Sequence, residues 1–294
     1  AELLAARLLT GVGIIMTWTS GANLVSATFE GRNAATATGI YTASAPLGYV
    51  VGQALPPLIA GEANWEANFL VAGAAIGASA ALFAATAYRT ARLPETEATA
   101  SLDDFRRILS SSGVWLVALM SFVAYSLNLF FNSWMPTYLT EEVGFTIADS
   151  GLLVALFPAM GAVSRTSGGL ISDRLLDRRR RPVPLVSFLV TAPIVVVMVV
   201  TETPLVIVVL LVVSGYFVQL GIGLFYTHVR ELVGEHVAGS ALAVLTMASF
   251  TGGFTAPVIA GWLIGISGSY LTSFGFAFGL ALSGVVLAWL APEP

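Results

Sequence analysis

The chain has 294 residues, of which 56% are hydrophobic and 10% are charged, and its mean hydropathy is +0.85. Soluble globular domains carry about 25% charged residues, so this composition excludes an aqueous globular domain and indicates a protein that folds in a lipid bilayer. The net charge of −4 argues against a nucleic-acid partner, and the absence of cysteine excludes disulfides and thiolate chemistry. The two histidines, His228 and His236, cannot form a zinc site by themselves, so we expect no metal and no cofactor.

Apolar runs of membrane-spanning length occur nine times along the chain. A helix needs about 20 apolar residues to cross a hydrocarbon core about 30 Å thick, and turn or charged residues separate the runs. The sequence therefore predicts an all-α membrane protein with nine transmembrane helices. In chain order the predicted spans are 3–28, 34–60, 67–88, 113–138, 147–172, 183–200, 204–228, 238–265 and 269–290.

Arginine marks one side of the membrane. The basic residues between spans follow spans one, three, five and seven, and none occurs in the loops 61–66, 139–146, 201–203 and 266–268. Because basic loops stay in the cytoplasm, we expect a multi-pass protein of the cell membrane with the loops 89–112 and 173–182 inside. The chain then begins outside, which predicts a truncation: three N-terminal helices of the same protein are missing.

The segment 89–112 is the only long polar stretch between predicted spans. Ser101 to Asp104 resembles a capping box, and the residues that follow predict a short amphipathic helix on the cytoplasmic membrane surface. A flexible linker is the alternative interpretation. In either case we expect residues 1–88 to be the remainder of an N-terminal bundle and residues 113–294 to form a six-helix C-terminal bundle.

The chain contains an internal repeat. A shift of 200 residues places the second predicted span on the eighth without a gap. The most specific match is the pattern Pro-x-Ile-Ala-Gly, which begins at Pro57 and recurs at Pro257. Both copies run from inside to outside, and parallel repeats of this kind are typical of membrane transporters.

Polar side chains are distributed unevenly among the spans. The third, sixth and ninth spans contain no Asn, Gln or charged residue in their interiors, whereas amides and an arginine occur in most of the others. Within a membrane, polar groups turn toward protein or water. We therefore expect every third helix to be peripheral and the remaining helices to line a passage for a solute.

Arg165 is the charged residue that lies deepest within a predicted span. It precedes Asp173 by eight residues, which at ~1.5 Å per helical residue places it ~12 Å inside the membrane. An unpaired guanidinium at this depth faces a polar cavity or a partner, and the interiors of the predicted spans contain no Asp or Glu. The partner is therefore an acid in the missing helices, a set of backbone carbonyls, or an anion that the protein carries.

The residues after the fifth span resemble a motif of the major facilitator superfamily. Gly169-x-x-x-Asp173-Arg174-x-x-x-Arg178-Arg179 is similar to the family's cytoplasmic loop motif, although the family's glycine before the last basic pair is absent. The resemblance covers the whole chain as helices four to twelve of a twelve-helix protein. It implies a truncated form of the family's two-bundle fold.

The same resemblance implies a gate on the cytoplasmic side. A carboxylate is favoured at the N-terminal end of a helix, so we expect Asp173 to accept hydrogen bonds from the amides near Gly239 and Ser240 at the start of the eighth span. The alternative is that the arginines only set the topology. The predicted gating residues are Gly169, Asp173, Arg174, Arg178 and Arg179.

Arg165 also occupies the position at which nitrate/nitrite and cyanate porters of the superfamily place an arginine, ahead of a Gly-Gly-x-x-x-Asp-Arg run that begins here at Gly168. The resemblance implies that the guanidinium binds a small anion, for which its planar fork is suited. The alternatives for the other polar residues are helix packing for the asparagines and snorkelling for the arginine of the first span. The further substrate-contacting residues that we expect are Asn128, Asn132, Gln219, Tyr216 and Arg7.

These features predict a secondary transporter and not an enzyme. We expect two helical bundles to move a small organic or inorganic anion by alternating access, with that small-molecule substrate and the lipid bilayer as partners. Drug or metabolite efflux is the alternative. A non-transporting membrane receptor and an intramembrane enzyme are further alternatives, although the spans offer no catalytic acid pair, serine–histidine set or metal ligands.

Overall fold

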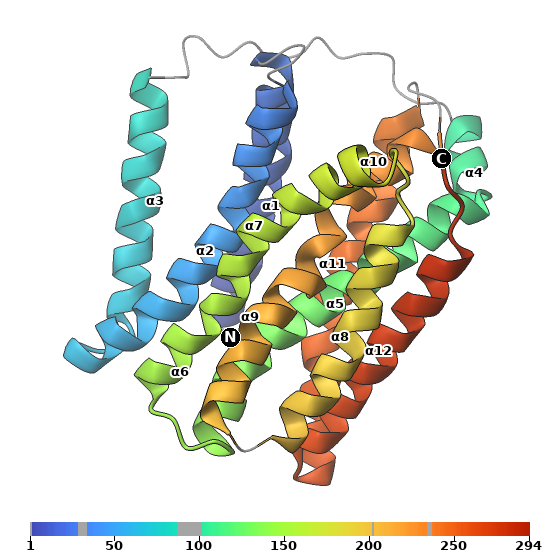
Figure 1. Ribbon diagram of the computed structural model, residues 1–294. Helices are drawn as coiled ribbons and strands as arrows, with labels where there is room; N and C mark the ends of the chain where they lie inside the picture. The colour runs from blue at the N-terminus through green and yellow to red at the C-terminus, as the bar shows by residue number, and fades with distance from the viewer. Residues whose placement is uncertain (1, 29–33, 87–101, 202, 234–236) are drawn as a thin grey trace. The chain divides into compact units, whose positions relative to one another are not determined.

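The computed structural model describes residues 2–28, 34–86, 102–201, 203–233 and 237–294, and every regular element in these residues is a helix (Figure 1). The helices are α1 (Glu2–Thr28), α2 (Ala34–Glu62), α3 (Ala67–Thr86), α4 (Leu102–Leu109), α5 (Ser112–Glu141), α6 (Ile147–Val154), α7 (Leu156–Leu170), α8 (Pro182–Val200), α9 (Pro204–Leu220), α10 (Ile222–Glu231), α11 (Ala238–Ser267) and α12 (Tyr270–Leu290). A π-helical turn, Ile171–Leu175, extends α7.

Seven helical segments within the described residues are long and apolar enough to cross a membrane. Two of them each combine consecutive helices, namely Ile147–Leu175 and Pro204–Glu231. Helices α1 and α2 coincide with the first two predicted spans and have 27 and 29 residues, which at ~1.5 Å per residue is also sufficient to cross a bilayer. The prediction of an all-α membrane protein is therefore confirmed.

The chain divides into two compact units. The first consists of Ala1–Ala45 and Glu62–Thr99, and the second consists of Pro46–Gly61 and Ala100–Pro294. The second half of α2 therefore belongs with the C-terminal helices, whereas we expected all of residues 1–88 in one bundle. Most of the predicted linker lies in residues 87–101, outside the described residues. Helix α4, near the linker's end, belongs to the second unit and buries Ile108 in its core.

In the first unit, one aromatic contact joins α1 to the beginning of α2. The Tyr41 hydroxyl donates to the Trp18 carbonyl oxygen at 2.8 Å, and the two rings lie 5.0 Å apart. Gly21 permits this approach, because a Cβ atom there would overlap the Tyr41 hydroxyl. Helix α3 buries none of its residues. Its apolar surface is suited to lipid or to further protein.

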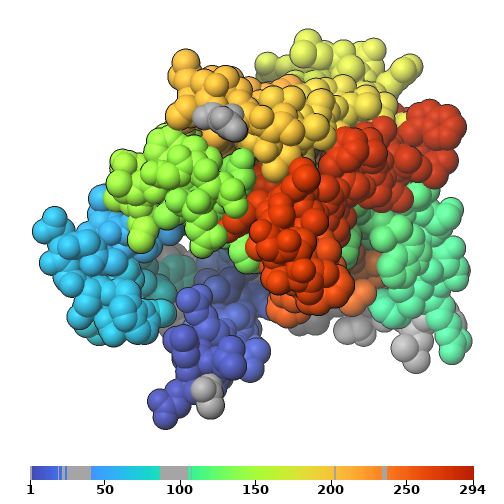
Figure 2. Space-filling model, turned by 90° about the horizontal axis from the view of Figure 1, so that it is seen from below, coloured from blue at the N-terminus to red at the C-terminus, as the bar shows by residue number. Residues whose placement is uncertain are grey.

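The second unit is built around α5, which packs along α11. Gly252 of α11 lies directly against the backbone oxygen of Phe122, where a side chain would collide. The buried hydroxyls of Ser121 and Ser249 are 2.6 Å apart and satisfy each other. Helix α8 lies between α9 and α12, and Figure 2 shows these helices side by side at the end of the molecule where α11 turns into α12.

Two of the long spans are interrupted for identifiable reasons. Pro158 has no backbone N–H to donate to the carbonyl of Val154, where α6 ends. Gly221 separates α9 from α10 and packs closely on Pro184 and Phe225. The first interruption precedes Arg165 in its span, and the second follows Gln219 in its span.

The contact at Gly252 leads to a stability prediction. Replacing Gly252 with alanine forces a methyl group against the Phe122 backbone oxygen, and overpacking of this kind costs about 1–3 kcal/mol. Gly265 of the same helix has nothing within 4 Å of the position of a Cβ atom, so alanine there is expected to be neutral or to stabilise the helix by up to about 1 kcal/mol. Thermal unfolding of the purified protein in detergent measures both. Equal shifts in the two variants would contradict the observed α5–α11 packing.

Candidate functional site

Arg165 lies on α7 and is half-buried. Its Nη2 donates to Oε1 of Gln219 on α9 at 3.1 Å, and its Nε is buried without a hydrogen-bond partner among the described residues. Gln219 is 1% exposed, and its Nε2 donates in turn to the Phe157 carbonyl oxygen at 3.4 Å. The deepest arginine is therefore held by a neutral amide, which orients the guanidinium without cancelling its charge.

Glycines bring α7 and α9 close enough for this contact. Gly161 faces the side chain of Gln219, Gly215 lies against the backbone of Phe157, and Gly168 lies against the backbone oxygen of Leu220. A Cβ atom at any of these glycines would overlap the neighbouring helix. The seam of small residues thus determines that Arg165 and Gln219 meet.

Tyr216 also belongs to the seam between α7 and α9. Its hydroxyl lies 2.9 Å from the Ser167 hydroxyl, and its backbone oxygen accepts a hydrogen bond from Ser164. Tyr216 therefore joins α9 to α7 both before and after Arg165 in the chain. Its place as a predicted substrate contact stays a prediction.

Asn128 and Asn132 form a second polar group on α5. Nδ2 of Asn132 donates to the backbone oxygen of Asn128 at 2.8 Å, and Nε2 of Gln53, from the second half of α2, donates to the backbone oxygen of Asn132 at 2.7 Å. Oδ1 of Asn132 is buried and has no hydrogen-bond partner in the described part of the chain. Phe131, the residue before Asn132, stacks on Phe157 with ring centroids 5.0 Å apart, which connects this group to the Gln219 seam.

Three tyrosines that we did not predict as site residues form a group near Arg165, where Gly223 of α10, three residues before Tyr226, lies against the Arg165 backbone oxygen. Tyr49 and Tyr226 each interact electrostatically with Arg165 and with Tyr125. The hydroxyls of Tyr125 and Tyr226 are 3.5 Å apart. These tyrosines come from the second half of α2, from α5 and from α10, so four helices contribute polar groups near one guanidinium.

Arg7 lies in the first unit. Its side chain is exposed, and its guanidinium lies over the ring of Phe69 at 5.8 Å from the centroid. This cation–π contact is a local arrangement within that unit. A substrate role for Arg7 stays a prediction.

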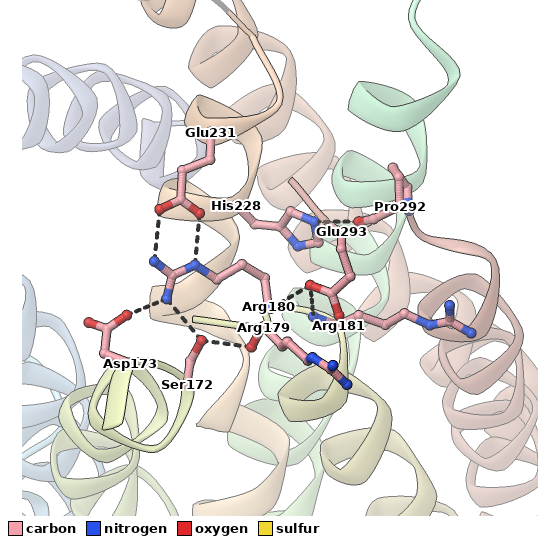
Figure 3. Close-up of polar contacts among 9 residues, drawn as sticks. All are labelled: Ser172, Asp173, Arg179, Arg180, Arg181, His228, Glu231, Pro292 and Glu293. Atoms are coloured by element: carbon pink, nitrogen blue, oxygen red, sulfur yellow. Dashed lines mark hydrogen bonds and ion pairs between the residues drawn. The ribbon is translucent and has the colours of Figure 1, made fainter. Parts of the chain in front are cut away.

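A second polar site lies at the inner end of the C-terminal helices and is centred on Arg180 (Figure 3). Its guanidinium forms a bidentate pair with Glu231 at the end of α10, with both N–O distances 2.7 Å. Nη1 donates to Asp173 Oδ1 at 2.5 Å and to Ser172 Oγ at 2.9 Å. The Arg180 side chain is only 5% exposed, and its hydrogen bond to Glu231 raises its pKa above the usual value, which burial partly opposes.

The C-terminal residues complete this network. Oε2 of Glu293 accepts from the backbone N–H of Arg180 at 2.8 Å and from that of Arg181 at 3.4 Å. Nε2 of the buried His228 lies 2.9 Å from the carbonyl oxygen of Pro292. The loop after the π-helical turn, the end of α10 and the segment after α12 are therefore tied to one another.

The structure differs from the expected partner of Asp173. Within the described residues, Asp173 pairs with Arg180 and makes no hydrogen bond to the amides of Gly239 or Ser240. The predicted gating arginines of this loop are exposed, namely Arg174, Arg178 and Arg179. Gly169 has open space where a Cβ atom would stand. The gating roles of these residues stay predictions, and Arg180 is the arginine that the structure places among the acids.

An all-helical membrane protein with a half-buried arginine inside an interrupted span has features that are typical of solute transporters. Residues 1–257 match the profile of the Major Facilitator Superfamily, so the chain belongs to this family, as the loop motif indicated, and it is a multi-pass integral membrane protein. A bacterial homologue of the human lysosomal transporter Spinster, solved in an inward-facing, occupied conformation, superimposes with a TM-score of 0.66 at 16% identity over 92% of this chain and 72% of that chain. This likeness shows the fold.

Curated relatives carry the names of anion transporters. The probable sulfoacetate transporter SauU of Cupriavidus necator is 30% identical over 58% of this chain and 41% of its own length. The probable galactarate/D-glucarate transporter GudP of Bacillus subtilis is 21% identical over 99% of this chain and 70% of its own. The probable nitrate transporter NarT of Staphylococcus haemolyticus is 22% identical over 85% of this chain and 62% of its own length. The chain thus spans less than half of the length of the sulfoacetate relative.

Proposed function

We propose that this protein is a secondary transporter that moves a small anion across the membrane by alternating access, with Arg165 as the anion ligand. The observation that supports the proposal most strongly is the environment of the Arg165 guanidinium. It lies deep in a membrane span, its one hydrogen-bonded side chain is the neutral Gln219, and its Nε is buried and unpartnered within the described residues. A permanent positive charge in this setting favours a bound anion.

Electrostatics support an anion over other solutes. At an effective dielectric constant of about 20, unit charges about 4 Å apart attract by about 4 kcal/mol. No described Asp or Glu pairs with Arg165; the ion pairs recorded in the described residues join Arg180 to Asp173 and Glu231. An incoming carboxylate, sulfonate or nitrate therefore meets a charge that the protein itself leaves uncompensated. The named substrates of the relatives, which are sugar acids, sulfoacetate and nitrate, are anions of this kind.

The inner-surface network supplies the second part of the mechanism. Alternating access requires helical bundles that move as rigid units, together with contacts at one surface that separate when that side opens. The Arg180 network joins three chain segments at the inner ends of the spans. We propose that it keeps the C-terminal helices together as a rigid body, and that Asp173 and the loop arginines act at the same surface as gating residues.

The function is tested by transport in proteoliposomes that contain the complete gene product. Uptake of labelled organic and inorganic anions is compared with uptake of neutral and cationic solutes of similar size, in the natural protein and in Gln219→Glu. The variant places a carboxylate at hydrogen-bond distance from Arg165 with almost no change in shape, so it should neutralise the site and lower anion uptake at least tenfold. Efficient uptake of cations with no uptake of anions, or anion uptake that is unchanged in the variant, would rule out the proposal.

A further inference from the structure

The tyrosines beside Arg165 leave hydrogen-bonding capacity unused. The separation of 3.5 Å between the hydroxyls of Tyr125 and Tyr226 is well beyond the usual value of about 2.7–2.8 Å for an O–H···O hydrogen bond. Each phenol can donate one hydrogen bond and accept others. The two hydroxyls therefore form only a long hydrogen bond with each other, in the same part of the unit as a guanidinium whose Nε has no partner in the described chain.

The surroundings of these hydroxyls are aromatic and contain no described acid. Tyr125 lies against Phe250 with ring centroids 6.4 Å apart, and the group nearest Tyr226 on α11 is the neutral hydroxyl of Thr246. Tyr49 adds a third phenol, within electrostatic reach of both Arg165 and Tyr125. The group thus combines neutral donors and acceptors with apolar ring faces, and it has one positive charge at its edge.

We propose that Tyr49, Tyr125 and Tyr226 form a subsite that binds the hydroxyl groups of a polyhydroxylated organic acid. Arg165 binds the carboxylate of the same molecule. An inorganic oxyanion only accepts hydrogen bonds, and the guanidinium alone can satisfy it. A hydroxyl group both donates and accepts, as a phenol does, so the tyrosines are matched to it. Ring faces can also cover the C–H surface of a short carbon chain. This inference rests on the proposed function and narrows its substrate class.

The inference predicts a preference that depends on solute hydroxyls. D-glucarate and adipate have the same carbon chain and the same acid groups, and only D-glucarate carries hydroxyls. The natural protein should take up D-glucarate in preference to adipate. Tyr125→Phe and Tyr226→Phe remove one hydroxyl each and keep the ring, so each should reduce this preference by roughly 3- to 10-fold, as expected for one lost hydrogen bond, with adipate uptake almost unchanged.

The matched control is Tyr138→Phe. Tyr138 is buried in the same unit, and its hydroxyl donates to the Met198 carbonyl oxygen at 3.2 Å, so its loss should affect the two acids equally. Ligand-induced shifts in the thermal unfolding of the purified variants report binding independently of transport. If the ratio of D-glucarate to adipate is the same in the natural protein and in both subsite variants, the tyrosine inference is overturned. If the natural protein transports neither acid nor any other anion, the proposed function fails with it, which distinguishes the two results.

Discussion

Replacing Arg165 with glutamine is expected to reduce anion uptake by roughly 10- to 150-fold, because a hydrogen bond to a charged group contributes about 1.5–3 kcal/mol. Glutamine can still reach Gln219, so the packing between α7 and α9 should persist. Lysine keeps the charge but loses the planar fork, and it is expected to retain part of the transport activity. Uptake of a labelled anion into proteoliposomes, measured over a range of concentrations, gives the change in apparent affinity.

Arg106→Gln is the matched control for charge. Arg106 is exposed on α4, outside the membrane spans, and the same substitution there removes one positive charge without changing the embedded site. Its uptake should lie within twofold of the natural protein's, which is the scatter expected for a surface substitution of about ±0.5 kcal/mol. Normal transport in Arg165→Gln, with normal amounts of folded protein in the membrane, would remove Arg165 from the binding site and with it the proposal of an anion carrier.

The features that the sequence predicted well are those with a local cause. Span positions follow from the length and hydropathy of each apolar run, and the long helices coincide with the predicted ranges. The family was recognisable because Gly169, Asp173 and Arg174 are adjacent in the chain. Arg165 stood out because a charge inside an apolar run is costly wherever the run packs.

The partners of Arg165 depend on packing that no local pattern specifies. Gln219 was a candidate only because it is polar, and it meets Arg165 because Gly161 and Gly215 let α7 and α9 approach. Tyr49 and Tyr125 were not predicted at all. Tyrosines are ordinary in membrane helices, and only the assembled unit brings Tyr49 within electrostatic range of Arg165 and the Tyr125 hydroxyl to 3.5 Å from that of Tyr226.

Arg180 illustrates the same limit at the inner surface. It is one of four consecutive arginines, and composition does not distinguish it from Arg179 or Arg181. The backbone does: Asp177 and Arg178 adopt left-handed conformations with φ of 50° and 63°, and this turn carries the chain back toward α10. In Figure 3 the side chains of Arg179 and Arg181 point away from Glu231 and Asp173, whereas that of Arg180 lies between them.

Replacing Arg180 with alanine is therefore expected to be the most damaging change in the loop. Removing one partner of a buried ion pair costs about 3–5 kcal/mol, but Asp173 and Glu231 are 53% and 37% exposed, and water compensates part of the loss. We expect a destabilisation of about 1–3 kcal/mol and a comparable loss of transport. The raised pKa of Arg180 keeps its side chain charged throughout the physiological pH range, so the effect should not depend on pH there.

Variants at neighbouring positions distinguish the contribution of the Arg180 network from a general effect of loop charge. Arg179→Ala removes the same charge from an exposed side chain and should change the unfolding free energy by less than about 0.5 kcal/mol. Arg180→Ala combined with Glu231→Gln should cost less than the sum of the two single changes, because the double variant no longer leaves a carboxylate without its partner. Thermal unfolding and uptake, measured on the same preparations, give both quantities. Equal losses of unfolding free energy in the two alanine variants, or strict additivity in the double variant, would show that the Arg180 network does not stabilise the inner surface.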